Sequence, residues 1–238
     1  MNFKILSTNL EYARGLDGSI KDWILKGYRA IFISPKTENK NLNKFKKIIQ
    51  RENPDLICIT EIKKNQISTL INKEYQYYKI NVKYTPGSKF EKSFLHKNNC
   101  NAIISKHNLN IQKINLKNGF KTLLYEIDLP NNIKLIHFHF SQNKKIRHKQ
   151  FQEIAKMYQN QKLKIICGDF NIVYGLKELN KFIQQSNLKI LNQKPTFPSI
   201  KPIKFYDLSL YSPELHPNLK ILPDIFSDHL ATILTIKL

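Results

Sequence analysis

The string Gly168-Asp169-Phe170-Asn171 carries two polar side chains directly after an apolar run at residues 163–167. The run is typical of a buried strand, and side chains two positions apart on a strand lie on the same face. Because a carboxylate and a carboxamide are costly to bury without partners, a face that carries both suits a site better than a core. Such a pair can help to hold a metal ion and orient a water molecule. Taken alone, Asp169 and Asn171 could equally cap a turn or a helix.

Further polar groups stand at the ends of other strand-like runs. Because side chains on loops that leave a rigid sheet often carry function, we expect these groups to converge. Most of them offer oxygen ligands, which suit Mg²⁺ or Mn²⁺. One of the two alternating histidines, His137 and His139, is expected to be structural, and we favour His139 for the site. The groups beside these runs are Asn9, Glu61, His139, Asp228 and His229.

The order of these groups resembles the endonuclease/exonuclease/phosphatase superfamily. That superfamily includes deoxyribonucleases, exonuclease III-like repair nucleases, inositol polyphosphate phosphatases and neutral sphingomyelinases. The resemblance covers essentially the whole chain, and residues 196–199 with Tyr206-Asp207 resemble a further stretch that carries an active-site Asp. The motifs, in the family's order, are Asn9, residues 53–61, residues 101–105, His139-Phe140-Ser141, Gly168-Asp169-Phe170-Asn171 and Ser227-Asp228-His229.

The resemblance implies a single domain over residues 1–238 with an α/β fold. This fold is a four-layer sandwich, in which two mixed β-sheets pack face to face and helices cover both outer sides. The implied reaction is metal-dependent hydrolysis of a phosphoester by an activated water, with Mg²⁺ or Mn²⁺ as cofactor. The implied metal-binding residues are Glu61, Asn9 and Asp228. The implied catalytic residues are His139, Asp169, Asn171, Asp207 and His229.

Each carried-over residue has a role in the implied reaction. Asp169 would orient or deprotonate the attacking water, and Asn171 would hold the phosphate. His229, held by Asp207, would contact the phosphoryl oxygen or share the role of general base. His139 would stabilise charge or assist the leaving group.

Two further residues are predicted to bind substrate. Asn101 lies in one of the family-like motifs. Arg147 follows the His139 run at helical spacing, so it could face the site or, equally, the solvent. Thr60 stands where many relatives have Gln, but no departure of this kind removes a catalytic side chain. We therefore expect an active enzyme rather than a polyanion-binding module that has lost catalysis. We favour a nuclease acting on DNA or RNA, and the alternative is a phospholipid or inositol-phosphate hydrolase of the same superfamily.

Elements that would position these residues recur along the chain without a clear domain break. Helical spacing of apolar residues predicts helices around residues 42–49, ending before Pro54, and around 151–158 and 179–183. The polar segment 84–99 reads as a loop or hairpin tip whose lysines could overhang a polyanion site. Strands are predicted at residues 3–10, 56–60, 102–105, 111–116, 123–129, 133–140, 163–167, 206–210 and 231–236.

The charge of the chain predicts a polyanionic substrate. Lys and Arg total 39 against 18 acidic residues, so the formal net charge is 39 − 18 = +21. Such a domain attracts nucleic acid, which we favour, or anionic phospholipid, the alternative. The same charge could arise from AT-rich codon usage alone, because the chain is rich in Lys, Asn and Ile.

Composition also bears on compartment and assembly. Cys58, Cys100 and Cys167 cannot form a disulfide framework, have no zinc-like spacing and favour a reducing compartment. No apolar run approaches the roughly 20 residues that span a bilayer. The N-terminal residues lack the long apolar stretch of a secretory signal, so we expect a cytoplasmic protein, with secretion of a trimmed chain left open. We expect a monomer.

Overall fold

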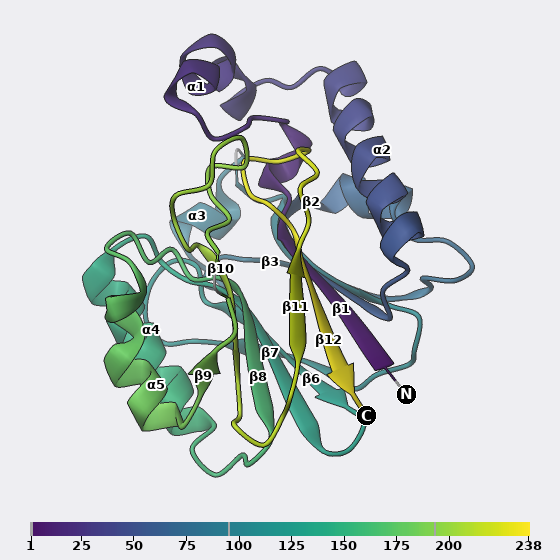
Figure 1. The fold of residues 1–238 in the computed structure, drawn as a ribbon. Helices are drawn as coiled ribbons and strands as arrows, with labels where there is room; N and C mark the ends of the chain where they lie inside the picture. The colour runs from purple at the N-terminus through teal and green to yellow at the C-terminus, as the bar shows by residue number, and fades with distance from the viewer. Residues whose placement is uncertain (1, 95, 193) are drawn as a thin grey trace.

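The computed structural model describes residues 2–94, 96–192 and 194–238, and these residues form four layers (Figure 1). Two six-stranded sheets pack face to face. Helix α2 (Pro35–Glu52) covers the first sheet, and α4 (Lys144–Met157) and α5 (Asn180–Ser186) cover the second. The predicted α/β four-layer sandwich is confirmed.

Both sheets are mixed, and each contains one parallel pair near its centre. In the first sheet β1 runs parallel to β2, and in the second β7 runs parallel to β8. The carboxyl ends of parallel strands lie at the same edge, so each sheet presents two strand ends side by side. The first sheet has the order β11 (Asn218–Ile221), β12 (Thr232–Lys237), β1 (Asn2–Asn9), β2 (Leu56–Lys63), β4 (Asn99–Ser105) and β3 (Tyr77–Val82). The second has the order β5 (Ile111–Asn115), β6 (Leu123–Leu129), β7 (Ile133–His139), β8 (Lys164–Asp169), β10 (Asp207–Tyr211) and β9 (Lys189–Ile190).

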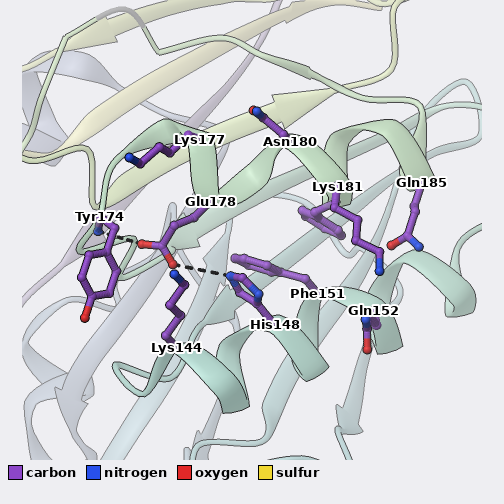
Figure 2. A pocket seen from close by; sticks show the side chains of 11 residues that line it. Lys144, His148, Phe151, Gln152, Tyr174, Lys177, Glu178, Asn180, Lys181 and Gln185 are labelled. Atoms are coloured by element: carbon purple, nitrogen blue, oxygen red, sulfur yellow. Dashed lines mark hydrogen bonds and ion pairs between the residues drawn. The ribbon is translucent and has the colours of Figure 1, made fainter.

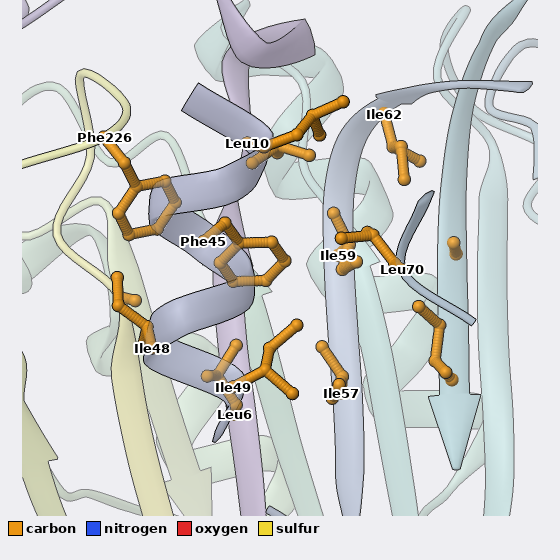
Figure 3. Packing of buried hydrophobic residues seen from close by; sticks show 14 of the residues in the cluster. Leu6, Leu10, Phe45, Ile48, Ile49, Ile57, Ile59, Ile62, Leu70 and Phe226 are labelled. Carbon is orange, nitrogen blue, oxygen red and sulfur yellow. The ribbon is translucent and has the colours of Figure 1, made fainter. Parts of the chain in front are cut away.

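Helix α2 illustrates how the sequence builds an outer layer. Ser34 caps its first turn by accepting a hydrogen bond from the Thr37 backbone N–H, and Pro35 occupies the first position, where its missing N–H costs nothing. The helix ends at Asn53, whose left-handed backbone breaks the helical run. Its buried face packs on β1 and β2 through the apolar residues that predicted it (Figure 3). These are Leu42, Phe45, Ile48 and Ile49.

The predicted strands and the three predicted helices are present, with shifts at their ends. Three strands were not predicted, namely β3, β9 and β11, because they lie at sheet edges and none of their residues is fully buried. Residues 84–94 and 96–98 form the tip of the antiparallel β3–β4 hairpin, as expected, and hold the short α3 (Lys89–Lys92). Residue 95 of the predicted loop lies outside the described residues. Helix α1 (Ile20–Lys26) was also missed. Short 3₁₀ turns are η1 (Glu11–Ala13), η2 (Gly27–Ala30), η3 (Lys64–Thr69) and η4 (Leu176–Leu179).

None of the helices in 2–94, 96–192 and 194–238 combines the length and the apolar character that crossing a bilayer requires.

Gly168 is required by the close approach of β8 to β7, and its substitution gives a first prediction. Its φ is +136°, and a Cβ atom built there would lie 2.0 Å from the carbonyl oxygen of Phe138. We expect Gly168→Ala to lower the free energy of unfolding by more than about 4 kcal/mol, which chemical denaturation would measure. Gly87→Ala is the matched control, because Gly87 also has a positive φ but has open space around it, so its cost is about 1 kcal/mol. Equal stability of Gly168→Ala and wild type would contradict this packing.

Candidate active site

The ends of β1, β7 and β8 bring three of the predicted side chains together. His139 lies opposite Asp169 in the parallel register of β7 and β8. The Asp169 Oδ2 atom is 3.4 Å from His139 Nε2, and it accepts a hydrogen bond from Asn9 Nδ2 at 3.1 Å. All three side chains are buried. Asn9 and Asp169 are 160 residues apart in the chain, so only the face-to-face packing of the sheets creates this contact.

The turn after β8 fixes Asn171 beside this group. Asn171 has a left-handed backbone with φ of 50°, and its N–H donates to Asp169 Oδ1 at 3.0 Å. Its Nδ2 donates to the carbonyl of Phe140 at 3.0 Å. One amide hydrogen is therefore held within the protein. The second amide hydrogen and the side-chain oxygen of Asn171 are the groups left for the predicted contact with phosphate.

Glu61 is presented by an irregularity in β2. The β2–β4 register shifts between Ile59 and Ile62, and Glu61 has a left-handed φ of 58°. Its backbone N–H donates a hydrogen bond to the Asn101 side-chain oxygen at 3.3 Å. A bulge of this kind turns a side chain away from the regular alternation of a strand. The structure thus brings Asn101 to the site, where its side-chain oxygen supports the backbone of Glu61.

Two lysines that the sequence did not single out for catalysis surround Glu61. Lys83, which is buried, forms an ion pair with Glu61 Oε1 at 2.8 Å, and Lys121 lies 3.8 Å from the same oxygen. Burial opposes ionisation of Glu61, but the positive charges of Lys83 and Lys121 outweigh it and hold the pKa of the carboxyl well below its usual range. Burial, and then repulsion by Lys83, lowers the pKa of Lys121 to about 8.

His139 is held as a neutral ring. Lys121 Nζ lies 2.6 Å from His139 Nε2 and can donate to it, which places the ring proton on Nδ1, 3.8 Å from Glu61. Burial, followed by the positive charges of Lys121 and Lys83, lowers the pKa of His139 well below its ordinary value. The neutral ring can thus accept or pass on a proton at Nε2, the nitrogen that faces Lys121.

Asp207 and His229 form a second buried pair, close enough to Asp169 for its charge to act on the histidine. His229 Nδ1 is 2.7 Å from Asp207 Oδ2, and His229 Nε2 is 3.8 Å from Asp228. Burial disfavours the imidazolium, but Asp207, Asp228 and Asp169 outweigh it and raise the pKa of His229 well above its ordinary value. Asp207 also faces Asp169 directly in the β10–β8 register. The surrounding carboxylates therefore favour the protonated form of His229.

Glu11 is an acidic side chain that the sequence did not point to. It is buried in η1, two residues after Asn9, and its Oε2 accepts a hydrogen bond from the Leu16 N–H at 3.1 Å. Its other oxygen, Oε1, is buried without a partner within the described residues. Burial, and then the charge of Asp228, raises the pKa of Glu11 to about 9.

The donor set fits a hard divalent cation. Glu11, Glu61 and Asp228 repel one another, and burial followed by the charge of Glu61 raises the pKa of Asp228 to about 6. An unpartnered carboxylate oxygen among like charges is a place where a cation would be stabilised. Ser227 links Asp228 to the carbonyl of Asn9, which keeps these two predicted metal residues together.

Mg²⁺ is expected to raise the thermal unfolding temperature by about 5 °C near pH 8 and by less near pH 5. The folded pKa of Glu11 (about 9) and that of Asp228 (about 6) lie above the unfolded values of 4.5 and 3.8. The folded state therefore binds more protons than the unfolded state, and these groups remove stability as the pH rises through that window. Calorimetry with Mg²⁺ and with EDTA checks this. Equal shifts at the two pH values, or the same shift with NaCl of matched ionic strength, would contradict it.

Arg147 is not brought into this group. It is fully buried, and its guanidinium bonds the carbonyls of Ser141 and Gln142 at 2.8 and 2.9 Å and the Glu178 carboxylate at 2.5 Å. These contacts tie α4 to η4, so we remove Arg147 from the substrate-binding residues. Both of the open readings, towards the site and towards solvent, are replaced by a structural role.

A separate cavity of about 380 Å³ lies between α4 and α5 (Figure 2). Glu178 contacts His148 at 3.6 Å across it, and the Tyr174 N–H donates to Glu178 at 2.8 Å. None of the residues that surround Glu61 and Asp169 lines this cavity. It is therefore distinct from the candidate active site.

The chain matches one protein family and several solved structures. The model of the endonuclease/exonuclease/phosphatase family matches residues 32–229. No curated protein matches the chain. Among solved structures, an endonuclease/exonuclease/phosphatase family protein from Bacteroides thetaiotaomicron superposes with a TM-score of 0.71 at 14% identity, over 99% of this chain and 97% of that one.

Two other solved structures have the same fold. A family protein from Leptotrichia buccalis C-1013-b gives a TM-score of 0.70 at 16% identity, over 99% of this chain and 100% of that one. Truncated TDP2 from Caenorhabditis elegans gives 0.67 at 14% identity, over 99% and 98%. At these identities the structures support the fold, while the family model supports membership. The chain belongs to the endonuclease/exonuclease/phosphatase family.

Proposed function

We propose that this protein is a divalent-metal-dependent phosphodiesterase, with nucleic acid as the first candidate substrate. The observation that carries the proposal is the convergence of Glu61, Asp169 and the Asp207–His229 pair at one edge of the two sheets. Family members are hydrolases of phosphoesters and generally use divalent metals.

Each side chain has a proposed role. Glu61, Asn9 and Asp228 would hold Mg²⁺ or Mn²⁺, with Glu11 as a fourth oxygen donor. A divalent cation there would neutralise charge on the phosphoryl oxygens and lower the pKa of the attacking water. Asp169 orients that water and accepts its proton.

The pKa of Asp169 and the two nearby histidines complete the proposed chemistry. Burial, together with the charge of Asp207, raises the pKa of Asp169 to about 6, which favours proton uptake near neutral pH. His229 supplies positive charge to the phosphoryl oxygens. His139 contacts both Asp169 and Lys121, and we assign His139 and Lys121 to assistance of the leaving group.

Net charge supports nucleic acid as the first candidate substrate, because +21 attracts any polyanion with strong salt dependence. A specific observation supports a second candidate, the phosphoester head group of an anionic phospholipid. Several large apolar side chains are exposed on the segment that follows η1, beside Asp228. Exposed Ile and Leu side chains do not contribute to phosphate recognition.

A substrate panel tests the proposal. Plasmid DNA, single-stranded DNA, RNA and phosphatidylserine vesicles would each be incubated with the protein in Mg²⁺, in Mn²⁺ and in EDTA. We expect cleavage of at least one substrate with metal, none in EDTA, and none by Glu61→Gln. Activity that persists in EDTA, or well-folded protein that cleaves nothing under any metal, would overturn it.

A further inference from the structure

Large apolar side chains are exposed to solvent in a short stretch that contains α1 and η2. We call residues 20–32 the apolar protrusion. Its seven large apolar side chains are each between 61% and 85% exposed. Apolar surface concentrated in this way on a soluble chain marks an interaction surface rather than ordinary variation. The seven are Ile20, Trp23, Ile24, Leu25, Tyr28, Ile31 and Phe32.

The protrusion has a defined shape, so this exposure does not come from a frayed end. Ser19 caps α1 by accepting from the Asp22 N–H at 3.1 Å. Arg14 donates to the carbonyl of Ala30, and Arg29 donates to the carbonyl of Arg14, each at 3.1 Å. These bonds fasten both η2 and α1 to the segment that leaves η1.

The base of the protrusion packs against the candidate active site. Gly18 has a φ of +80°, and a Cβ atom built there would lie 2.7 Å from Pro198 Cβ and 3.2 Å from Asp228 Cβ. The Ser199 hydroxyl donates to the carbonyl of Asp17 at 3.2 Å. In Figure 1 α1 stands out from the sheets, beyond the loops at the end of β1 and β2. Whatever binds the protrusion is therefore brought next to Asp228.

Apolar side chains are exposed on a second segment that reaches the same site. Phe120 is 57% exposed and directly precedes Lys121, whose Nζ contacts His139. Its ring packs on Phe90 of α3, with centroids 4.8 Å apart. Phe94 is also exposed, and the Lys97 ammonium lies over its ring. Two segments with exposed apolar and basic side chains therefore adjoin the site. The protrusion adjoins it at Asp228, and the segment of Phe120 adjoins it at Lys121.

Charge on the protrusion is basic. Lys21, Lys26 and Arg29 alternate with the apolar side chains. The single acidic residue between 18 and 32 is Asp22, which is buried and ion-paired with Lys26. Trp, Tyr and Phe beside Lys and Arg are the composition of protein surfaces that sit in the head-group region of a membrane.

We propose that the apolar protrusion docks the protein onto the surface of a bilayer that contains anionic lipid. A bilayer offers both an apolar interior and negative head groups, which match the two kinds of side chain present. A second copy of this chain carries the same charge of +21 and would be repelled. Nucleic acid presents a charged phosphate exterior, and receiving Ile24 or Ile31 would require its bases to be unstacked. Docking places the site at the level of lipid phosphates. The docking proposal extends the proposed function and does not depend on it.

The chain supplies its own probe, because Trp23 is its only tryptophan and lies in the protrusion. Intrinsic fluorescence and co-sedimentation would be measured with vesicles of phosphatidylcholine alone and of an equal mixture with phosphatidylserine, all in EDTA so that no hydrolysis occurs. We expect a blue shift and sedimentation with the mixed vesicles. The double variant Ile24→Ser/Ile31→Ser should weaken binding by about a hundredfold, at about tenfold for each buried side chain.

Met157→Ser is the matched control, because Met157 is exposed on α4, outside the protrusion, and its loss should leave binding unchanged. Absence of the blue shift, equal binding to both kinds of vesicle, or undiminished binding by the double variant would overturn the proposal. A blue shift produced without vesicles, by DNA or by dimer formation at high protein concentration, would also overturn it. Docking by a protein that hydrolyses nothing would support this inference while removing the proposed function.

Discussion

Asp169→Asn is expected to lower kcat/KM by about 10³-fold, with little change in the affinity for substrate. The substitution keeps the shape of the side chain. Because Asn9 and Asn171 donate to different oxygens of Asp169, the single oxygen of the new side chain can accept from only one of them. It removes the negative charge and the capacity to accept a proton from water. Steady-state kinetics on the substrate that the panel identifies, together with a binding assay, would measure both quantities.

The matched control for this variant is Asp128→Asn. Asp128 is the same residue type, on β6, paired with Lys134 at the opposite end of the second sheet from His139 and Asp169. It should retain full activity. Asp169→Asn activity within a few-fold of wild type would remove Asp169 from the reaction and would leave it as a buried hydrogen-bond acceptor for Asn9.

The residues predicted from the sequence are those at the ends of regular strands. Asp169 and His139 follow apolar runs, which was enough to predict that they would converge on one site; that their strands are parallel neighbours is seen only in the structure. The order of the motifs indicated the family and therefore the sandwich. The roles of these residues stay predictions, as do the single domain and the monomer.

Other features depend on geometry that no local pattern encodes. Glu61 was predicted, but the bulge and left-handed backbone that present it arise from pairing with β4. Lys83 and Lys121 could not be separated from the chain's many other basic residues. Arg147 was ambiguous because helical spacing fixes a face of the helix and not what that face contacts, which proved to be Glu178.

Helix α1 shows a different limit of prediction from the sequence. Sequence reasoning finds helices by an apolar face that repeats at helical spacing and is buried. In α1 the apolar residues occur on an exposed element, and the only buried residue is Asp22. The same property that hid the helix from prediction is the one that suggests a docking surface.

Removal of the His229 cation is the second large effect that we expect. His229→Ala should lower kcat/KM by about 10³-fold, because no other group takes the place of its ring between Asp207 and Asp228. Asp207→Asn should cost less, about 10²-fold, because the ring remains but its orientation and charge are less well fixed. The two variants therefore separate the presence of the ring from its protonation.

The pH profile of Asp207→Asn decides whether the charge of His229 matters. If the imidazolium is the active form, activity is lost as the pH rises through the pKa of His229. Asp207 is the largest influence that raises that pKa against burial, so its neutralisation should move the alkaline limb of the pH–activity profile to lower pH. Tyr206→Phe is the matched control, because it removes only a hydroxyl 3.4 Å from Lys204 Nζ and leaves the ring beside His229. An alkaline limb that stays in place in Asp207→Asn would show that His229 acts through hydrogen bonding rather than charge.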